Sequence, residues 1–240
     1  MKKDIIEYLW RRFPHHCIVL TDPGTRRVID LGAQRAGAHR FRAPEQVCSW
    51  VTLMIFFGSF FDEDPLFAWA GETLRETRDA PRDDVLRMLY RRMNEATTPV
   101  LGEDAANYRR ALAWMRKLEF EAVLSDNQGA ANFDESLHGW IRAAFPARYA
   151  SLSPDTLRYL TSRAQGWARQ YGLAPVSGAV ECLLLMTLFG SHVDRDPIRP
   201  WAAAALQDSS FSDPLRKTLS LHESVQRTLR RFAMLDRFRS

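Results

Sequence analysis

The chain contains 240 residues, of which 46% are hydrophobic and 26% charged, with a formal net charge of +4. This composition excludes a disordered or fibrous chain, and the length allows one large domain or two smaller ones. The 3 cysteines, Cys17, Cys48 and Cys182, are too widely spaced for a metal-binding cluster or a disulfide framework, which fits a reducing compartment.

The amino terminus does not resemble a secretory signal, because the acidic residues Asp4 and Glu7 precede any apolar run. The longest apolar stretch, 51–61, is shorter than the roughly 20 residues needed to cross a bilayer. We therefore expect a cytoplasmic protein without a membrane partner.

Helical patterns dominate the sequence. The first is weak: it covers 28–38 and is interrupted by Gly32 and Gly37, each of which costs roughly 1 kcal/mol relative to alanine. The apolar run 47–57 follows Pro44, and both its length and this proline favour a buried helix over a buried strand.

Apolar residues at steps of three and four predict most of the remaining helices, and a second buried apolar run predicts another. These helices are expected over 82–92, 105–124, 137–144, 157–171, 179–189 and 215–238. A turn is expected at 129–132, and the sequence contains no convincing series of alternating strands. The predicted fold class is therefore all-α.

One segment of the chain occurs twice. Residues 57–70 recur as 189–202, and the match extends upstream, where Phe13-Pro14 pairs with Phe145-Pro146. Self-similarity at a fixed offset indicates duplication of a structural unit. We therefore predict two tandem, similar helical units packed as one compact helical protein. The first unit covers 1–80, connecting helices cover 81–130, and the second unit, with a long carboxy-terminal helix, covers 131–240.

The repeated segment carries two acidic residues in each copy, Asp62 and Asp64 in the first and Asp194 and Asp196 in the second. Such pairs can hold a metal ion or perform acid–base chemistry, and a hydrolase or metal-dependent enzyme built on them is one hypothesis. Calcium, however, takes about six to eight oxygen ligands, and no acidic run of the usual loop form surrounds either pair.

A structural interpretation accounts for more of the repeated residues, and we favour it. Glycine can end a buried helix in a left-handed conformation, aspartate can cap the next helix, and proline suits its first position. The tryptophan that follows can then pack back onto the buried helix. This structural loop motif comprises Gly58, Asp62, Asp64, Pro65 and Trp69 in the first copy and Gly190, Asp194, Asp196, Pro197 and Trp201 in the second. We expect no catalytic residue, no bound metal and no cofactor.

Four residues in or beside the repeated loops are candidates for binding a partner protein, because aromatic residues and arginines are enriched at binding hot spots. They are Phe60, Phe61, Phe67 and Arg199. Packing of the phenylalanines in the interior is the alternative. Arginines near the carboxy terminus, including Arg237 and Arg239, are interpreted as the solvated face of an amphipathic helix, so no nucleic-acid partner is expected.

The second copy contains a longer set of distinctive residues. They are, in order, Arg169-Gln170-Tyr171-Gly172-Leu173, Phe189-Gly190, Asp194-x-Asp196-Pro197 and Pro200-Trp201. This order resembles that of a family of small helical bacterial proteins often encoded beside type VI secretion spike proteins, effectors and effector-loading adaptors. The first copy departs from the pattern, with Ala68 in place of the second proline and His39-Arg40 in place of the tyrosine–glycine step.

The resemblance implies a protein that binds another protein, with no known reaction. The implied partner is another bacterial protein, either a toxin effector or its adaptor. One hypothesis is a non-enzymatic effector adaptor or co-chaperone of a type VI secretion effector module. The alternative is a cytoplasmic immunity protein that binds and neutralises a cognate toxin. Both roles need a helical scaffold with a complementary surface, and both hypotheses stay open.

Overall fold

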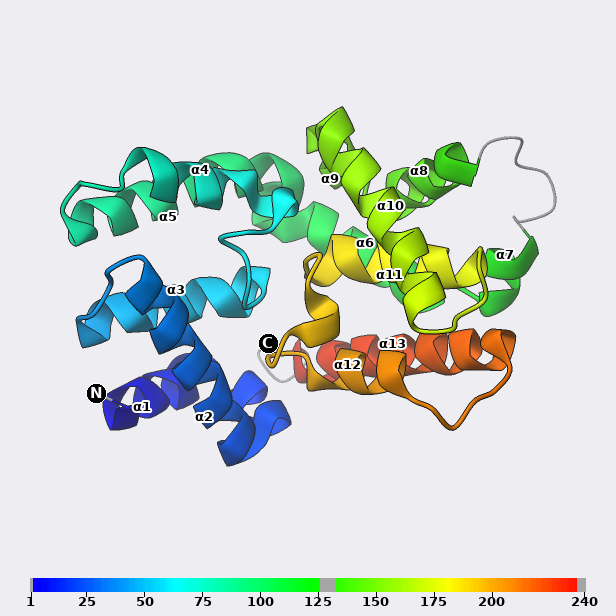
Figure 1. The fold of residues 1–240 in the computed structure, drawn as a ribbon, viewed down its shortest axis with the longest axis horizontal. Helices are drawn as coiled ribbons and strands as arrows, with labels where there is room; N and C mark the ends of the chain where they lie inside the picture. Colours follow the sequence, from blue (N-terminus) through cyan, green and yellow to red (C-terminus); the bar gives the residue numbers. More distant parts are fainter. Residues whose placement is uncertain (1, 126–132, 237–240) are drawn as a thin grey trace. The chain divides into compact units, whose positions relative to one another are not determined.

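A computed structural model describes residues 2–125 and 133–236 (Figure 1). Within these residues all regular secondary structure is helical and no strand occurs, so the predicted all-α class is confirmed. The turn expected at 129–132 and the arginines Arg237 and Arg239 lie outside the described residues. No helix in the described part of the chain is long and apolar enough to cross a membrane.

The chain divides into two units, each with its own internal packing. Unit 1 contains residues 1–96 and 192–200, and unit 2 contains residues 97–191 and 201–240. The stretch 192–200, which carries the repeated aspartates of the second copy, therefore packs inside unit 1. These two units are defined by which residues pack together. The expected division at residues 80 and 130 is based on the repeated sequence instead, and it stays a prediction.

Unit 1 begins with three helices that pack against one another: α1 (Lys2–Arg12), α2 (Pro14–Ala38) and α3 (Pro44–Phe57) (Figure 1). Proline at the first position starts both α2 and α3, which for α3 confirms the prediction. The core between these helices contains Ile5, Ile29, Trp50 and Leu53. The other elements of unit 1 are η1 (Pro65–Phe67), α4 (Ala68–Glu76), most of α5 (Arg82–Leu101) and η4 (Val193–Arg195).

Gly32 lets α2 and α3 approach closely. A Cβ atom at this position would lie 2.4 Å from Cγ2 of Val51 on α3, closer than two carbon atoms can pack. Val51 is fully buried, and valine in a helix has one strongly preferred rotamer, so its side chain cannot turn away. The glycine that weakens the helical pattern of the sequence therefore serves the packing of two helices.

A Schellman motif ends α2. The N–H groups of Arg40 and Phe41 donate to the carbonyls of Gly37 and Ala36, both at 2.9 Å, and Arg40 has a φ of 66°. The turn after α10 (Pro154–Gln170) has the same hydrogen-bond pattern, with Gly172 at φ 62°. Glycine adopts this conformation freely, whereas an arginine is held in it at a cost of about 1–2 kcal/mol.

Unit 2 is arranged around α11, and the predicted buried helix over 179–189 is confirmed. Its elements are η2 (Glu103–Ala105), α6 (Ala106–Lys117), α7 (Phe120–Ser125), α8 (Phe133–Ala144), α9 (Pro146–Ser151), α10, α11 (Ser177–Phe189), α12 (Pro200–Gln207) and α13 (Pro214–Asp236). Helices α7, α8, α10 and α13 pack against α11 (Figure 1). Glu181 of α11 is buried, and its Oε1 lies 2.7 Å from Nδ1 of His222 on α13.

The helix expected over 105–124 is interrupted, which corrects the prediction. α6 ends at Lys117, and Leu118 has an extended backbone with ψ 119°. The amide group of Gln226 donates to the carbonyls of Met115 and Leu118, at 2.7 and 3.2 Å. Because Gln226 lies on α13, a contact between residues distant in sequence stabilises the break.

Candidate functional site

Gly58 and Gly190 end α3 and α11 with the same backbone conformation. Their φ and ψ angles are 97° and 158° in the first case and 99° and 151° in the second. The positive φ agrees with prediction, but ψ is extended instead of helical, in a region essentially restricted to glycine. The rings of Trp69 and Trp201 then pack edge-to-face on the last phenylalanine of each helix, with centroids 5.4 and 5.7 Å apart.

The repeated loops of both copies contact each other inside unit 1. Oγ and the backbone N–H of Ser59 donate to the carboxylate of Asp196, at 2.5 and 3.3 Å. The same carboxylate accepts from the N–H of Ile198 at 2.9 Å and from Nη1 of Arg199 at 2.7 Å. Asp196 is buried, so four donors occupy its oxygens and hold the loop in place. This carboxylate is a structural anchor.

Asp64 caps the helix that follows it. Its Oδ1 accepts from the N–H of Leu66 at 3.0 Å, and Pro65 stands at the first position of η1, as predicted. Pro197 differs, because η4 has already ended and α12 begins only at Pro200. The second aspartate–proline pair therefore closes a turn, which corrects the expectation of a helix cap there.

Asp62 has a different environment from Asp196. Its side chain accepts hydrogen bonds from Arg35, at 2.7 and 3.2 Å, and lies 3.1 Å from Nε2 of His39. Burial pushes the pKa of Asp62 upward, but the bonds from His39 and Arg35 outweigh it and hold the pKa below its usual value. Asp62 thus braces the loop against α2. Asp194, its counterpart in the second copy, is buried within η4.

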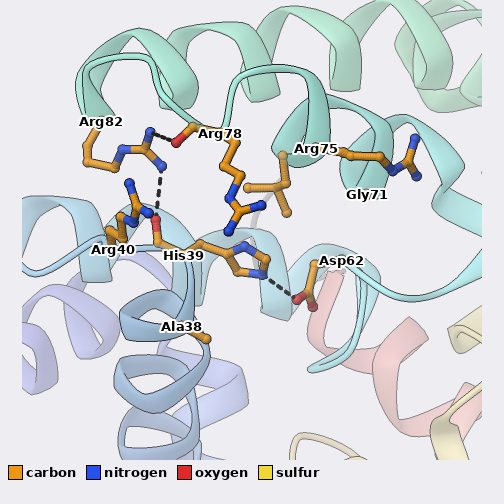
Figure 2. A pocket seen from close by; sticks show the side chains of 9 residues that line it. Ala38, His39, Arg40, Asp62, Gly71, Arg75, Arg78 and Arg82 are labelled. Atoms are coloured by element: carbon orange, nitrogen blue, oxygen red, sulfur yellow. Dashed lines mark hydrogen bonds and ion pairs between the residues drawn. The ribbon is translucent and has the colours of Figure 1, made fainter.

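A pocket of about 300 Å³ opens beside Asp62 in unit 1 (Figure 2). It lies between the end of α2, the loop that carries Asp62, α4 and the turn that leads to α5. Gly71 permits this arrangement, because a Cβ atom there would lie 2.9 Å from the carbonyl oxygen of Asp62. The pocket is lined by Ala38, His39, Arg40, Asp62, Gly71, Leu74, Arg75, Arg78 and Arg82. This arginine-rich lining attracts anions.

Arg82 holds the wall of the pocket together. Its guanidinium donates to the carbonyls of His39 at 3.1 Å, Thr77 at 3.3 Å, Arg78 at 2.7 Å and Ala80 at 3.1 Å. A cation is favoured beside the carbonyl ends of helices, and here it joins the end of α2 to the end of α4 (Figure 2). Arg82 is therefore a structural residue of the site.

The other arginines of the pocket, Arg40, Arg75 and Arg78, are exposed to solvent. None of them forms an ion pair with a carboxylate among residues 2–125 and 133–236. Figure 2 shows them spread along the pocket, with Arg40 beside Arg82, Arg78 above His39 and Arg75 nearer Gly71. These three guanidinium groups can bind an anionic ligand without first breaking an existing pair.

Phe61 and Phe67 do not fit the predicted partner-binding surface, and this part of the prediction is corrected. The ring of Phe61 packs on Trp50 at a centroid distance of 4.9 Å, and that of Phe67 packs on Phe57 at 5.0 Å. Both phenylalanines are buried. They belong to the core of unit 1, because the repeated loop folds back onto α3.

Phe60 and Arg199 are partly exposed, and their role in partner binding stays a prediction. The ring of Phe60 lies between two cations, with the guanidinium carbons of Arg35 and Arg195 at 4.8 and 4.4 Å from its centroid. The side chain of Arg199 is only 11% exposed and is paired with Asp196. Both residues are thus engaged within unit 1.

The arginine pocket was not predicted from the sequence. Arg75, Arg78 and Arg82 follow the first repeated tryptophan at steps of three and four, a spacing that places them near one another. Arg40 stands where the other copy has Gly172. These two signals were present in the sequence, but the pocket also depends on the approach of α4 to the end of α2, which no local pattern indicates.

Among the described residues, no group of three histidine, cysteine or acidic side chains is placed to hold a metal ion. No known protein family, curated protein or solved structure matches the chain.

Proposed function

We propose that this chain is a non-enzymatic, protein-binding accessory protein of a bacterial type VI secretion effector module, where it acts in the cytoplasm as an effector adaptor or co-chaperone. The observation that carries the proposal is the pocket of unit 1, in which Arg40, Arg75 and Arg78 face solvent without an ion-pair partner among the described residues. Binding of another macromolecule can supply the missing negative charge.

The environments of Asp62 and Asp196 support a structural role for these two carboxylates. Asp196 is saturated by four hydrogen-bond donors, and Asp62 is engaged by Arg35 and His39. A general base or a metal ligand needs a free lone pair directed at its target. These two aspartates belong to the motif that resembles the secretion-associated family. Their hydrogen bonds indicate that they stabilise the fold.

We also propose that the two matching segments are copies of one helical unit. The supporting features are the glycine conformation at the end of α3 and α11, the tryptophan packed on each helix, and the Schellman motif after α2 and α10. Superposition of 2–76 on 134–208 in a crystal structure tests this proposal, and different helix packing in the two segments would contradict it.

Deletion of the gene in its native host tests the proposed role. An adaptor is required for delivery, so we expect loss of toxin delivery to target cells without self-killing of the deletion strain. Self-intoxication that disappears when the neighbouring toxin is inactivated would contradict the adaptor hypothesis and favour an immunity protein. Re-expression of the wild-type chain from a plasmid is the control, and it must restore the original phenotype.

A further inference from the structure

We infer that the pocket of unit 1 binds an acidic segment of a protein, whose aspartate or glutamate carboxylates pair with Arg40, Arg75 and Arg78. We take this segment to belong to the partner of the proposed function, and in this respect the inference rests on that function. The preference of the pocket for carboxylates can nevertheless be measured without knowing the partner.

The charges around the pocket leave these guanidinium groups unbalanced. The carboxylate of Asp62 is paired with Arg35, so it does not neutralise the other arginines. Glu76, which follows Arg75 on α4, is paired with Arg92 at 2.5 Å. The carboxylates of Asp62 and Glu76 are thus engaged by Arg35 and Arg92, and a ligand with its own negative charge can pair with the remaining guanidinium groups.

The spacing of the arginines favours an extended acidic segment over a single compact anion. Arg40 follows α2, Arg75 lies on α4 and Arg78 lies in the turn before α5. Figure 2 shows the guanidinium groups of these three arginines well apart from one another and not gathered around one point. A guanidinium group presents a planar pair of donors that matches one carboxylate. Three arginines that lie apart can therefore each pair with a different acidic side chain of an extended segment.

The size of the pocket agrees with this ligand. A volume of about 300 Å³ lies at the small end of the usual range for ligand pockets. It can receive one or two acidic side chains while the backbone of the segment runs across the opening. Specificity would then depend on the separation of the carboxylates.

The backbone at Arg40 is a second observation in favour of a binding role. A Schellman turn is most easily built with glycine, and the corresponding turn of unit 2 has Gly172. At position 40 the chain holds an arginine at φ 66° and directs it to the edge of the pocket. Strain of this kind is often retained where a side chain contributes to function.

The test is a binding titration with a fluorescein-labelled hexaglutamate peptide, followed by fluorescence anisotropy at low ionic strength, with the hexaglutamine peptide as the uncharged control. We compare the full wild-type chain with Arg75→Ala/Arg78→Ala and with Arg40→Gly. Arg27→Ala serves as the matched control, because Arg27 is exposed on α2 and does not line the pocket. Thermal denaturation verifies that each variant is folded.

We expect the double variant to bind hexaglutamate about tenfold more weakly and Arg40→Gly about threefold more weakly, as for the loss of exposed charge pairs. Arg40→Gly is the decisive variant, because glycine relieves the strained backbone and the protein should melt at the same or a higher temperature while binding less well. Weaker binding therefore cannot be attributed to unfolding.

Three results would overturn the inference. Unchanged binding by the arginine variants would exclude the pocket, and an equal loss in Arg27→Ala would indicate nonspecific attraction. Displacement of the peptide by millimolar inorganic phosphate, but not by equal concentrations of acetate, would indicate a phosphate site. If the peptide binds as expected while the deletion strain delivers its toxin normally, the inference about the pocket is supported and the proposed adaptor function is contradicted.

Discussion

The substitution Asp196→Asn tests whether the repeated loop stabilises the fold or forms a functional site. Asparagine keeps the size of the side chain but removes its charge and replaces one acceptor oxygen by a donor. In the native loop both oxygens face donors, since Ser59, Ile198 and Arg199 all donate to this carboxylate. The variant therefore places two donors face to face and leaves the guanidinium of Arg199 without its anion.

The expected cost follows from the burial of this pair. Removal of one partner of a buried ion pair costs about 3–5 kcal/mol, because the remaining charge is left uncompensated. The side chain of Arg199 retains 11% exposure and can gain some hydration, so we expect the lower end, a loss of about 3 kcal/mol in the free energy of unfolding. For a chain of this length that loss lowers the melting temperature by about 6–12 °C.

Urea denaturation followed by circular dichroism measures this loss. Asp155→Asn is the control: its carboxylate is 84% exposed and pairs with Arg158 on the surface of α10, so the change should stay within about 0.5 kcal/mol. Adding Arg199→Met to Asp196→Asn should recover part of the stability by removing the orphaned charge. A stability of Asp196→Asn within about 0.5 kcal/mol of wild type would refute the role of Asp196 as a structural anchor.

Asp62→Asn should lower the free energy of unfolding at pH 7 by about 1.5–3 kcal/mol, because it weakens charge-assisted hydrogen bonds. The folded pKa of Asp62 lies below its usual value, so its stabilisation is present above about pH 3.9 and is lost as pH falls through the folded pKa; a difference from wild type that persists unchanged in stronger acid would contradict this. Burial lowers the pKa of His222, but the bond to Glu181 outweighs it and raises the pKa, so stability should fall as pH rises above about 6.5. Glu181→Gln should flatten this dependence in denaturation series at several pH values, and an equal slope in the variant would argue against the pair. On α2, Gly37→Ala should stabilise the protein by up to about 1 kcal/mol, because nothing lies within 4 Å of the new Cβ, whereas Gly32→Ala should destabilise it by about 1–3 kcal/mol through overpacking. A urea midpoint of Gly32→Ala at or above that of wild type would show that the close approach of α2 and α3 does not constrain this position.

Features that depend on neighbouring residues were predictable from the sequence. The start of α3 at Pro44, the positive φ of Gly58 and Gly190, and the cap formed by Asp64 each involve interactions within a few positions of the chain. Steric limits and capping hydrogen bonds act at that range, so local patterns contain the necessary information.

Features that depend on distant contacts were not predictable. The break after α6 is stabilised by Gln226 of α13, and the turn at Asp196 is held by Ser59, which lies in the other copy of the repeat. The arginine pocket forms only when α4 approaches the end of α2, an approach that Gly71 permits and Arg82 stabilises. One sequence without a tertiary fold does not reveal these pairings.

The internally bonded aspartates and the pocket arginines of unit 1 have different roles, and this difference explains why the motif is repeated in the sequence while the pocket arginines are not. Asp62 and Asp196 are engaged internally, so their replacement costs folding energy and both copies of the loop retain an aspartate at these positions. The side chains of Arg40, Arg75 and Arg78 form no hydrogen bond or ion pair among the described residues, so they can change without loss of the fold. At the left-handed turn one copy has Gly172, the relaxed residue, and the other has Arg40 at an energetic cost. A turn that tolerates either residue contributes a cation to the pocket only where arginine is present, so the proposed binding site belongs to the first copy, whereas the structural aspartates occur in both.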